Sequence, residues 1–312
     1  MKNIDLGKSG LSAPEITVGC MRMSALSLKE TTEVIRASMD VGINFFEHAD
    51  IYGAGDCEEI FGKAINELGI KREELLLQTK CGIEIKPNWA GLLSYNFTKD
   101  YIIHCVEQSL KRLQTDYVDV LALHRPDTLM EPDEIAEVFE TLHSSGKVRN
   151  FGVSNFNSEQ MVLLQKSVPF KLIVNQLQLS LVHTGMLDCG FNVNVANNAA
   201  NNKDGSILEF CRHQDVTIQA WSPFIRSSTG KVFIDDPDLP ELNSKMAEIA
   251  EKYNVTKDAV AVAWILRHPA KIQVVIGSMN PERIKNIAKA SDFTLTHHEW
   301  YALYMSAGNN LP

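Results

Sequence analysis

The sequence lacks a long hydrophobic run. Nowhere in its 312 residues do about 18 consecutive apolar side chains occur, the length needed to cross a bilayer. The opening MKNIDLGKSG also lacks the continuous apolar stretch of a secretory signal peptide. These two absences predict neither a membrane span nor secretion, so we expect a cytoplasmic protein.

An excess of positive charge is absent as well. The chain has 30 Lys and Arg residues and 39 Asp and Glu residues, which gives a net charge of −9. Residues of the two signs are interspersed along the sequence. An acidic surface disfavours polyanionic partners, and no zinc-knuckle spacing or aromatic-basic RNA motif is present. The sequence therefore argues against nucleic-acid binding.

The sequence contains few cysteines, and their spacing shows no paired motif. Six cysteines without a C-x-x-C pair are too few for a disulfide framework in a chain of 312 residues. We expect reduced thiols, mostly in the core, at Cys20, Cys57, Cys81, Cys105, Cys189 and Cys211.

Short apolar runs alternate with amphipathic stretches from end to end, without a Pro-, Gly- or Ser-rich linker. This pattern favours a single α/β domain over residues 1–312. The predicted strands are Ile16–Gly19, Ile43–Glu47, Leu75–Lys80, Val118–His124, Val148–Val153, Leu172–Gln176, Thr217–Trp221 and Gln273–Ile276. The predicted helices are Lys29–Met39, Cys57–Glu67, Lys99–Leu113, Asp133–Ser144, Ser158–Gln165, Ser206–His213, Leu242–Tyr253, Lys257–Arg267 and Pro281–Ala290.

Eight successive β-then-α units close most naturally into a (β/α)8 TIM barrel, because doubly wound sheets usually have about six strands. Turn signals at Gly7 and Gly10 predict an N-terminal β-hairpin before the barrel, and a helical tail is expected from Thr294 onward. The fold class expected is thus α/β, with one barrel using nearly the whole chain.

Three stretches exceed the minimal unit, and all follow strand C-termini, where a barrel has its active site. They are Gly82–Phe97, Val182–Asp204 and Ser222–Glu241. Residues 192–202 within the second are rich in Asn, and we interpret them as a weakly specified loop without a functional role.

Four polar residues follow or end three adjacent predicted strands: Glu47, Tyr52, Lys80 and His124. Strands of a parallel barrel are buried on both faces, so a lysine or a histidine at a strand end needs an explanation other than packing. Each residue alone is more often structural. Together, at one barrel mouth, they predict a catalytic site.

These residue types fit protonation of an oxygen. A tyrosine has an unperturbed pKa of about 10, and a neighbouring ammonium favours the phenolate, so we expect Lys80 to lower the pKa of Tyr52 and make it a proton donor. Glu47 would hold Lys80 charged and oriented. His124 would position a substrate carbonyl.

The sequence resembles the aldo-keto reductase family over essentially its whole length. The residues that carry this resemblance stand in order along the chain: I-D-L-G-K-S-G-L-S-A-P-E-I-T-V-G, G-I-N-F-F-E-H-A-D-I-Y-G, Q-T-K-C-G, L-A-L-H-R-P-D, G-K-V-R-N-F-G-V-S-N-F, V-N-Q-L-Q, A-W-S-P-F and V-V-I-G-S-M-N-P-E-R-I. The resemblance implies NADPH-dependent reduction of an aldehyde or ketone to an alcohol. The hydride would come from the nicotinamide and the proton from Tyr52.

The resemblance also implies cofactor contacts along the barrel mouth. Ser154, Asn155 and Gln176 would bind the carboxamide, and Trp221 would stack on the nicotinamide. The remaining expected contacts are Met21 after the first strand, Ser222 and Phe224 along the pyrophosphate, and Ser278, Asn280 and Arg283 at the adenosine end, with Arg283 on a 2′-phosphate. Two alternatives stay open: Ser154 and Asn155 could cap the following helix, and Trp221 could be core packing.

Three positions depart from the family pattern. Glu47 stands where the family has Asp, and the extra methylene could weaken activity because catalytic geometry tolerates little displacement. Gly277 replaces a frequent lysine, and Ile287 replaces an adenine-contacting Asn. NADPH is expected because Arg283 remains, with NADH not excluded.

The substrate is a small carbonyl compound that the sequence does not identify. Trp89, Tyr95 and Phe97 are candidate pocket residues, although aromatic anchoring of their loop is an equal alternative. We expect a monomer or weak homo-oligomer without a membrane partner. A second hypothesis, favoured by Glu47, is a nicotinamide-binding sensor or regulatory protein with weak turnover.

Overall fold

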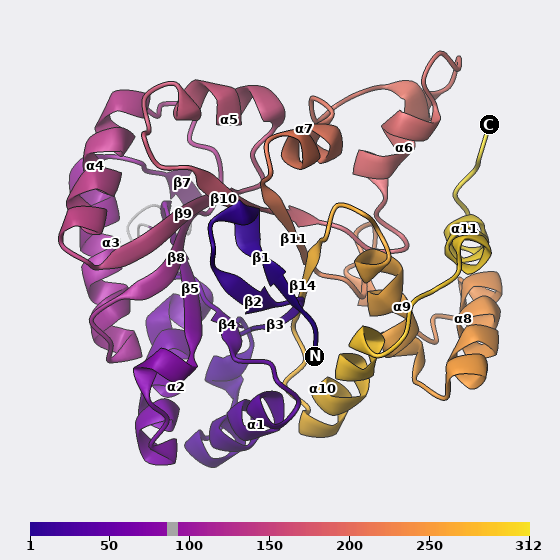
Figure 1. Ribbon diagram of the computed structural model, residues 1–312, viewed down its shortest axis with the longest axis horizontal. Helices are drawn as coiled ribbons and strands as arrows, with labels where there is room; N and C mark the ends of the chain where they lie inside the picture. Colours follow the sequence, from indigo (N-terminus) through magenta and orange to yellow (C-terminus); the bar gives the residue numbers. More distant parts are fainter. Residues whose placement is uncertain (86–92) are drawn as a thin grey trace.

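The computed structural model describes residues 1–85 and 93–312. Eight parallel strands form a closed barrel (Figure 1). In sequence order they are β3 (Ile16–Gly19), β4 (Phe45–Glu47), β5 (Leu76–Cys81), β8 (Val118–Leu123), β9 (Val148–Ser154), β10 (Leu172–Gln178), β11 (Thr217–Trp221) and β14 (Gln273–Ile276). The predicted (β/α)8 barrel is confirmed, and β3, β11 and β14 have the predicted bounds.

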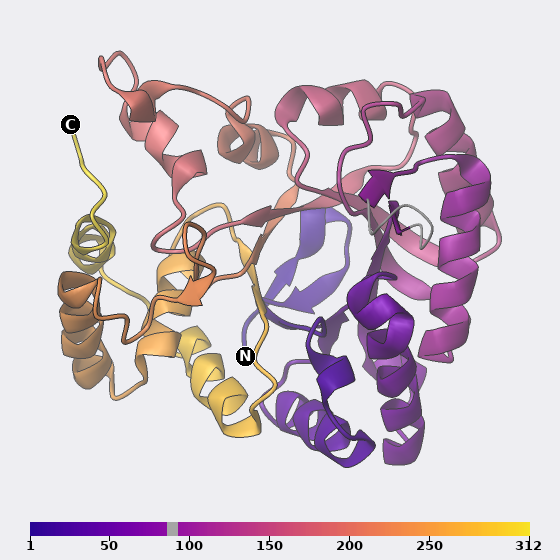
Figure 2. The same cartoon turned by 180° about the vertical axis from the view of Figure 1, so that it is seen from behind.

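Helices surround this barrel (Figure 2). They are α1 (Leu28–Asp40), α2 (Asp56–Leu68), α3 (Lys99–Leu113), α4 (Pro132–Ser144), α5 (Ser158–Gln165), α6 (Gly185–Phe191), α7 (Ile207–His213), α8 (Pro240–Tyr253), α9 (Lys257–Leu266), α10 (Pro281–Ala288) and α11 (His297–Ser306). Of these, α11 is the expected helical tail. It packs outside α8 and α9, where Trp300 stacks on Trp264 with ring centroids 4.9 Å apart.

Helix α6 corrects an expectation, because the sequence predicted a loop throughout Val182–Asp204. Gly185 and Gly190 give this segment a low helix propensity. Tertiary contacts stabilise it nevertheless: Met186 and Leu187 are buried, and the hydroxyl of Tyr304 on α11 donates to Asp188 at 2.6 Å. A local sequence pattern does not show such distant contacts.

Two short hairpins at the mouth were not predicted either. Strand β6 (Ile83–Ile85) pairs with β7 (Leu93–Tyr95), and β12 (Ile225–Arg226) pairs with β13 (Lys231–Val232). Strands of two or three residues are too short to show an alternating pattern.

The expected N-terminal hairpin closes the lower end of the barrel. Strands β1 (Asn3–Asp5) and β2 (Ser12–Pro14) cross that opening in Figure 1. Between them the chain turns at Gly7, whose φ is +59°. A Cβ at Gly7 would lie 2.6 Å from the Cα of Ile173, so only glycine fits this close approach.

A polar layer fills the middle of the barrel. Gln78, Gln219 and Gln273 are fully buried, and Gln219 exchanges hydrogen bonds of 2.8 and 2.9 Å with Gln78 and donates to Gln273 at 2.8 Å. Buried amides are costly unless they are hydrogen-bonded, so this layer fixes the relation of β5, β11 and β14 beneath the mouth.

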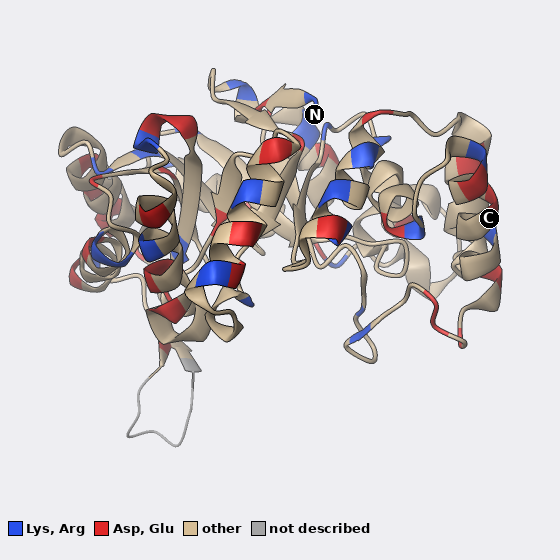
Figure 3. Cartoon of the chain, turned by 90° about the horizontal axis from the view of Figure 1, so that it is seen from below, with Lys and Arg blue, Asp and Glu red and all other residues tan. Residues whose placement is uncertain are grey.

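The surface agrees with the composition. Lys and Arg alternate with Asp and Glu along the outer helices in Figure 3. All six cysteines are free, and five are buried. Among the described residues, no helix has both the length and the apolar character needed to span a bilayer.

Candidate active site

Four functional side chains meet at the upper mouth of the barrel. Glu47 is the last residue of β4, Lys80 lies near the end of β5, and His124 directly follows β8. Tyr52 begins a 3-10 turn (Tyr52–Gly55) after β4. Because these strands are neighbours in the barrel, the structure brings together the four residues singled out from the sequence.

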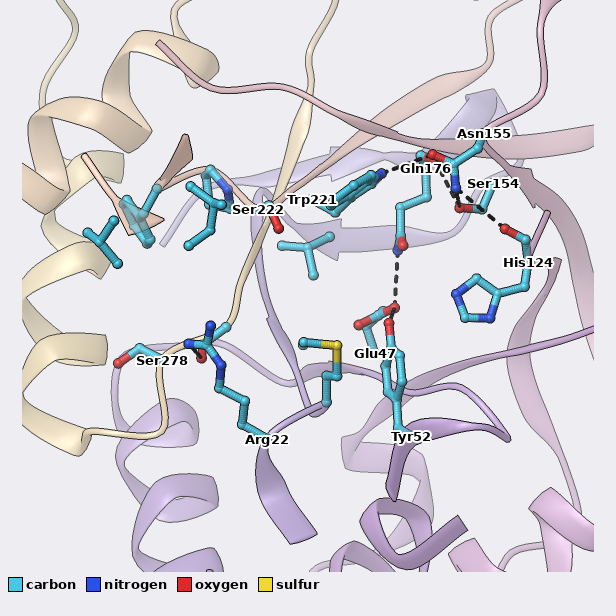
Figure 4. Close-up of a pocket in the computed structure, with 18 of the residues that line it drawn as sticks. Arg22, Glu47, Tyr52, His124, Ser154, Asn155, Gln176, Trp221, Ser222 and Ser278 are labelled. Atoms are coloured by element: carbon cyan, nitrogen blue, oxygen red, sulfur yellow. Dashed lines mark hydrogen bonds between the residues drawn. The ribbon is translucent and has the colours of Figure 1, made fainter. Parts of the chain in front are cut away.

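Lys80 is the centre of the group. Its Nζ donates to the Tyr52 hydroxyl at 2.9 Å and to the carbonyl of His48 at 2.9 Å, and it forms an ion pair with Oε1 of Glu47. The same Glu47 oxygen accepts from the Tyr52 hydroxyl at 3.3 Å (Figure 4). Lys80 is wholly buried and Glu47 is 2% exposed, so their charges neutralise each other away from solvent.

Glu47 reaches Lys80 despite its extra methylene, and Gly19 provides the space. A Cβ at Gly19 would lie 3.0 Å from Oε2 of Glu47 and 2.9 Å from the side chain of Val275. Any larger residue at position 19 would press against the carboxylate. The glutamate is thus accommodated by a glycine on the neighbouring strand β3.

Burial raises the pKa of the Tyr52 phenol above its usual range, and Arg125 opposes this effect. The direction is opposite to the lowering expected from Lys80. The reason is that removing a phenolate from water costs more than a lysine compensates when burial also lowers the pKa of that lysine. Tyr52 is therefore protonated at neutral pH.

His124 is neutral. Burial lowers its pKa to about 2, with Lys80 and Arg125 contributing. Its ring lies 6.0 Å from that of Tyr52, centroid to centroid, in an edge-on arrangement, and its Nδ1 is buried without a hydrogen-bond partner. A neutral imidazole beside the phenol can orient a carbonyl oxygen without competing for the proton.

The mouth pocket is lined by nine of the ten residues predicted to bind cofactor: Met21, Ser154, Asn155, Gln176, Trp221, Ser222, Phe224, Ser278 and Arg283. In Figure 4, side chains at the ends of β9 and β11 form a chain of hydrogen bonds, and Gln176 of β10 donates separately to Glu47. Trp221 donates to Asn155 at 3.2 Å, and Asn155 donates to Ser154 at 2.8 Å.

The structure argues against both structural alternatives, helix capping by Ser154 and Asn155 and core packing of Trp221. The side chain that caps α5 is Asn157, which accepts from the amide of Gln160, so Ser154 and Asn155 are free of that role. The indole of Trp221 is half-buried and lines the pocket instead of the core. In contrast, Asn280 caps α10 by accepting from Arg283 N–H at 3.0 Å and does not line the pocket.

Arg283 has a partner that sequence reasoning missed. Its Nε donates to Asp258 on α9 at 2.9 Å, and Nη2 contacts the same oxygen. The guanidinium also lies 5.1 Å from the ring centroid of Phe224. A 2′-phosphate at this end would therefore share Arg283 with a carboxylate.

Two further arginines of the pocket were also missed, Arg22 and Arg125. The only sequence signal was their position, since each directly follows a predicted site residue. Arg22 lines the pocket together with Ser278 (Figure 4), and its guanidinium donates to the carbonyl of Gly277 at 3.4 Å. It supplies positive charge where the family's lysine is missing.

Of the three aromatic candidates for substrate contact, Tyr95 and Phe97 do not line this pocket. Trp89 lies outside the described residues. Tyr95 is on β7 with 45% of its surface exposed. Phe97 is buried, and its ring stacks on Phe156 at 6.4 Å, as a loop anchor does.

A second pocket of about 840 Å³ adjoins the first, under the 182–204 segment. Arg125, Asn155 and Trp221 line both pockets. Asn198 and Asn201 of the Asn-rich loop line its far side. The loop thus forms a wall of the mouth, a role that its composition did not indicate.

The residues of the first pocket fit a nicotinamide dinucleotide. Amide and hydroxyl groups of Ser154, Asn155 and Gln176 surround the point next to Tyr52, where a carboxamide needs donors and acceptors. At the other end, a Cβ at Gly277 would meet nothing within 4 Å. Open backbone beside Arg22 and Ser278 suits phosphate groups.

Comparison with known proteins agrees with this geometry. The family model "Aldo/keto reductase family" matches residues 15–304. The chain belongs to the aldo/keto reductase family. It is 38% identical to the uncharacterized oxidoreductase YcsN of Bacillus subtilis, over 91% of this chain and 90% of that one. Identity to a 6-dehydroglucose reductase of Agrobacterium fabrum is 34%, over 88% and 86%.

Solved structures of this family have the same barrel. An aldo-keto reductase from Klebsiella pneumoniae in complex with NADPH superposes with a TM-score of 0.75 at 26% identity, covering 97% of this chain and 93% of that one. Family membership makes the protein an oxidoreductase of the kind that reduces small-molecule carbonyl compounds.

Proposed function

We propose that this aldo/keto reductase reduces an aldehyde or ketone to an alcohol with NADPH, and that Tyr52 donates the proton. The observation that carries the proposal is the contact of 2.9 Å between Lys80 Nζ and the Tyr52 hydroxyl, at the open mouth of the barrel. Relatives named as reductases and a Klebsiella neighbour in complex with NADPH support it.

The protonated phenol is the starting state. Tyr52 holds its proton because burial raises its pKa, and its hydroxyl donates to Glu47 at 3.3 Å. A carbonyl oxygen between Tyr52 and neutral His124 would accept from both side chains. NADPH would supply a hydride for the carbonyl carbon when bound, and Tyr52 would give its proton to the carbonyl oxygen.

Lys80 stabilises the product side of this proton transfer. Its ammonium already donates to the Tyr52 oxygen, so negative charge that develops there meets a preorganised donor. Glu47 keeps Lys80 charged in a buried position. Ser154, Asn155 and Gln176 would orient the carboxamide, and Trp221 would cover the ring.

NADPH is proposed over NADH because Arg22, Arg283 and Ser278 line the part of the pocket that we assign to the phosphate groups. The ion pair of Arg283 with Asp258 reduces this preference. A titration in which NADH binds as tightly as NADPH would contradict the choice.

A single experiment tests the function. Purified protein is mixed with NADPH, binding is followed by fluorescence, and loss of NADPH absorbance is followed with aromatic aldehydes, diketones and sugars. We expect binding and turnover of at least one class. Binding without any turnover would favour the sensor hypothesis, and absence of binding would contradict both.

A further inference from the structure

Arg125 is a half-buried arginine without a carboxylate partner at the junction of the two pockets. Five other arginines form salt bridges, namely Arg72, Arg112, Arg149, Arg226 and Arg283, and Arg22 and Arg267 donate to backbone carbonyls. Over residues 1–85 and 93–312, Arg125 has no hydrogen-bond or ion-pair partner, and 86–92 contain no Asp or Glu. Its Cζ lies 5.9 Å from the ring centroid of Trp221.

An unpaired guanidinium beside a buried site is expensive unless a ligand uses it. Arg125 directly follows His124 in the chain. It lines the same pocket as Tyr52 and His124, and its charge contributes to the low pKa of His124, after burial and Lys80. An anion held by Arg125 would thus lie a few bonds from a carbonyl held by Tyr52 and His124.

The cofactor does not account for this charge. Arg22 and Arg283 line the first pocket together with Ser278, and we assign these three residues to phosphate groups. Arg125 lines the second pocket as well as the first, and neither Ser278 nor Arg283 contributes to the second. The two cationic regions therefore serve two different molecules.

The polar lining of the second pocket suits a substrate that carries hydroxyl groups. Side chains of Asn157, Gln160, Gln178 and Asn201 line it, and their amides can donate and accept hydrogen bonds. Besides Arg125, the charged side chains that line it are Asp188, Lys203 and Asp204, and Asp188 is bonded to Tyr304. The two acids outnumber Lys203 in this part of the pocket, which favours the Arg125 end for the negative group.

We infer that Arg125 is a specificity-determining residue that selects carbonyl substrates bearing a carboxylate or phosphate a few bonds from the carbonyl. The guanidinium fork matches either group with two parallel hydrogen bonds. This inference rests on the proposed reductase function and names the substrate class for the same site.

The test compares charged and neutral substrates of matched shape. Succinate semialdehyde is compared with its methyl ester, and glyceraldehyde 3-phosphate with glyceraldehyde, by kcat/KM with NADPH. We expect the parent to prefer the anion of at least one pair. Arg125→Gln should lower that preference about 10- to 100-fold, as expected for hydrogen bonds to a charged group, and Arg125→Lys should restore part of it.

A control variant separates the two cationic regions. Arg22→Gln should raise the KM for NADPH with every substrate and leave the anion-to-neutral ratio as in the parent. A parent without preference in either pair, or an Arg125→Gln variant with the parental ratio, would overturn the inference while the reductase function stands. Failure to reduce any carbonyl compound would overturn both.

Discussion

Lys80 and Glu47 form an ion pair that lies wholly inside the barrel mouth, and the same carboxylate oxygen accepts a hydrogen bond from Tyr52. Burial lowers the pKa of Lys80, and a carboxylate in direct contact favours the charged form of a lysine. The pair therefore keeps a positive charge beside the phenol that we propose as the proton donor.

Shortening this carboxylate gives the first prediction. Glu47 already contacts Lys80 and has room beside Gly19. The kcat of Glu47→Asp should therefore not exceed that of the parent and should stay within about tenfold of it. The kcat of Glu47→Gln should be much lower, since this substitution removes the negative charge. Steady-state kinetics on one aldehyde measures both. A gain of orders of magnitude in Glu47→Asp would show that the glutamate is a handicap.

Filling the space beside the carboxylate gives the second. Gly19→Ala places a methyl group 3.0 Å from Oε2 of Glu47, and overpacking of this kind costs about 1–3 kcal/mol. We expect a lower free energy of unfolding in urea and a reduced kcat. The double variant Gly19→Ala/Glu47→Asp should recover kcat, because the shorter acid frees the space. Additive losses in the double variant would argue against this coupling.

The third prediction concerns cofactor choice. Asp258→Ala removes the carboxylate that pairs with Arg283, so Arg283 becomes free for a 2′-phosphate. The Kd for NADPH should fall about tenfold relative to that for NADH, a difference of about 1.4 kcal/mol. Fluorescence titration of both dinucleotides measures it, and Arg283→Ala is the matched control that should abolish the preference. An unchanged ratio in Asp258→Ala would place the 2′-phosphate elsewhere.

Asp50 gives a prediction for stability against pH. Burial raises its pKa to about 7, and its Oδ1 has no hydrogen-bond partner. The folded state thus binds a proton that the unfolded state, with a pKa of about 3.9, releases earlier. This group stabilises the fold least above pH 7, and its contribution falls as pH rises from about 4 to 7.

Asp50→Asn removes that dependence. The unfolding free energy of the variant minus that of the parent should increase by up to about 4 kcal/mol from pH 4 to pH 8. Urea unfolding at several pH values measures the difference between the two proteins, in which the other titrating groups cancel. A difference that does not change with pH would show that Asp50 is ionised in the folded protein.

Much of the barrel was predictable because its strands are short runs of three to seven residues, rich in apolar side chains, and several of them end at polar groups. The proximity of the candidate catalytic residues was predictable for the same reason, since Glu47, Lys80 and His124 stand at the ends of such runs. A parallel barrel then brings consecutive strand ends together without further information.

What could not be predicted depends on contacts between distant positions. The ion pair of Arg283 with Asp258 connects α10 to α9. The space that Glu47 on β4 occupies is left by Gly19 on the neighbouring strand β3. The direction of the Tyr52 pKa depends on burial, which a strand-end position does not reveal. Helix α6 is stabilised by contact with α11, more than 100 residues further along the chain.

The central claim is that Tyr52 donates the proton, and Tyr52→Phe tests it most directly. The variant keeps the ring and removes only the hydroxyl that contacts Lys80. We predict that kcat for aldehyde reduction falls by about 100- to 10,000-fold while the Kd for NADPH stays within about threefold of the parent. Retention of the parental kcat in Tyr52→Phe would contradict the account.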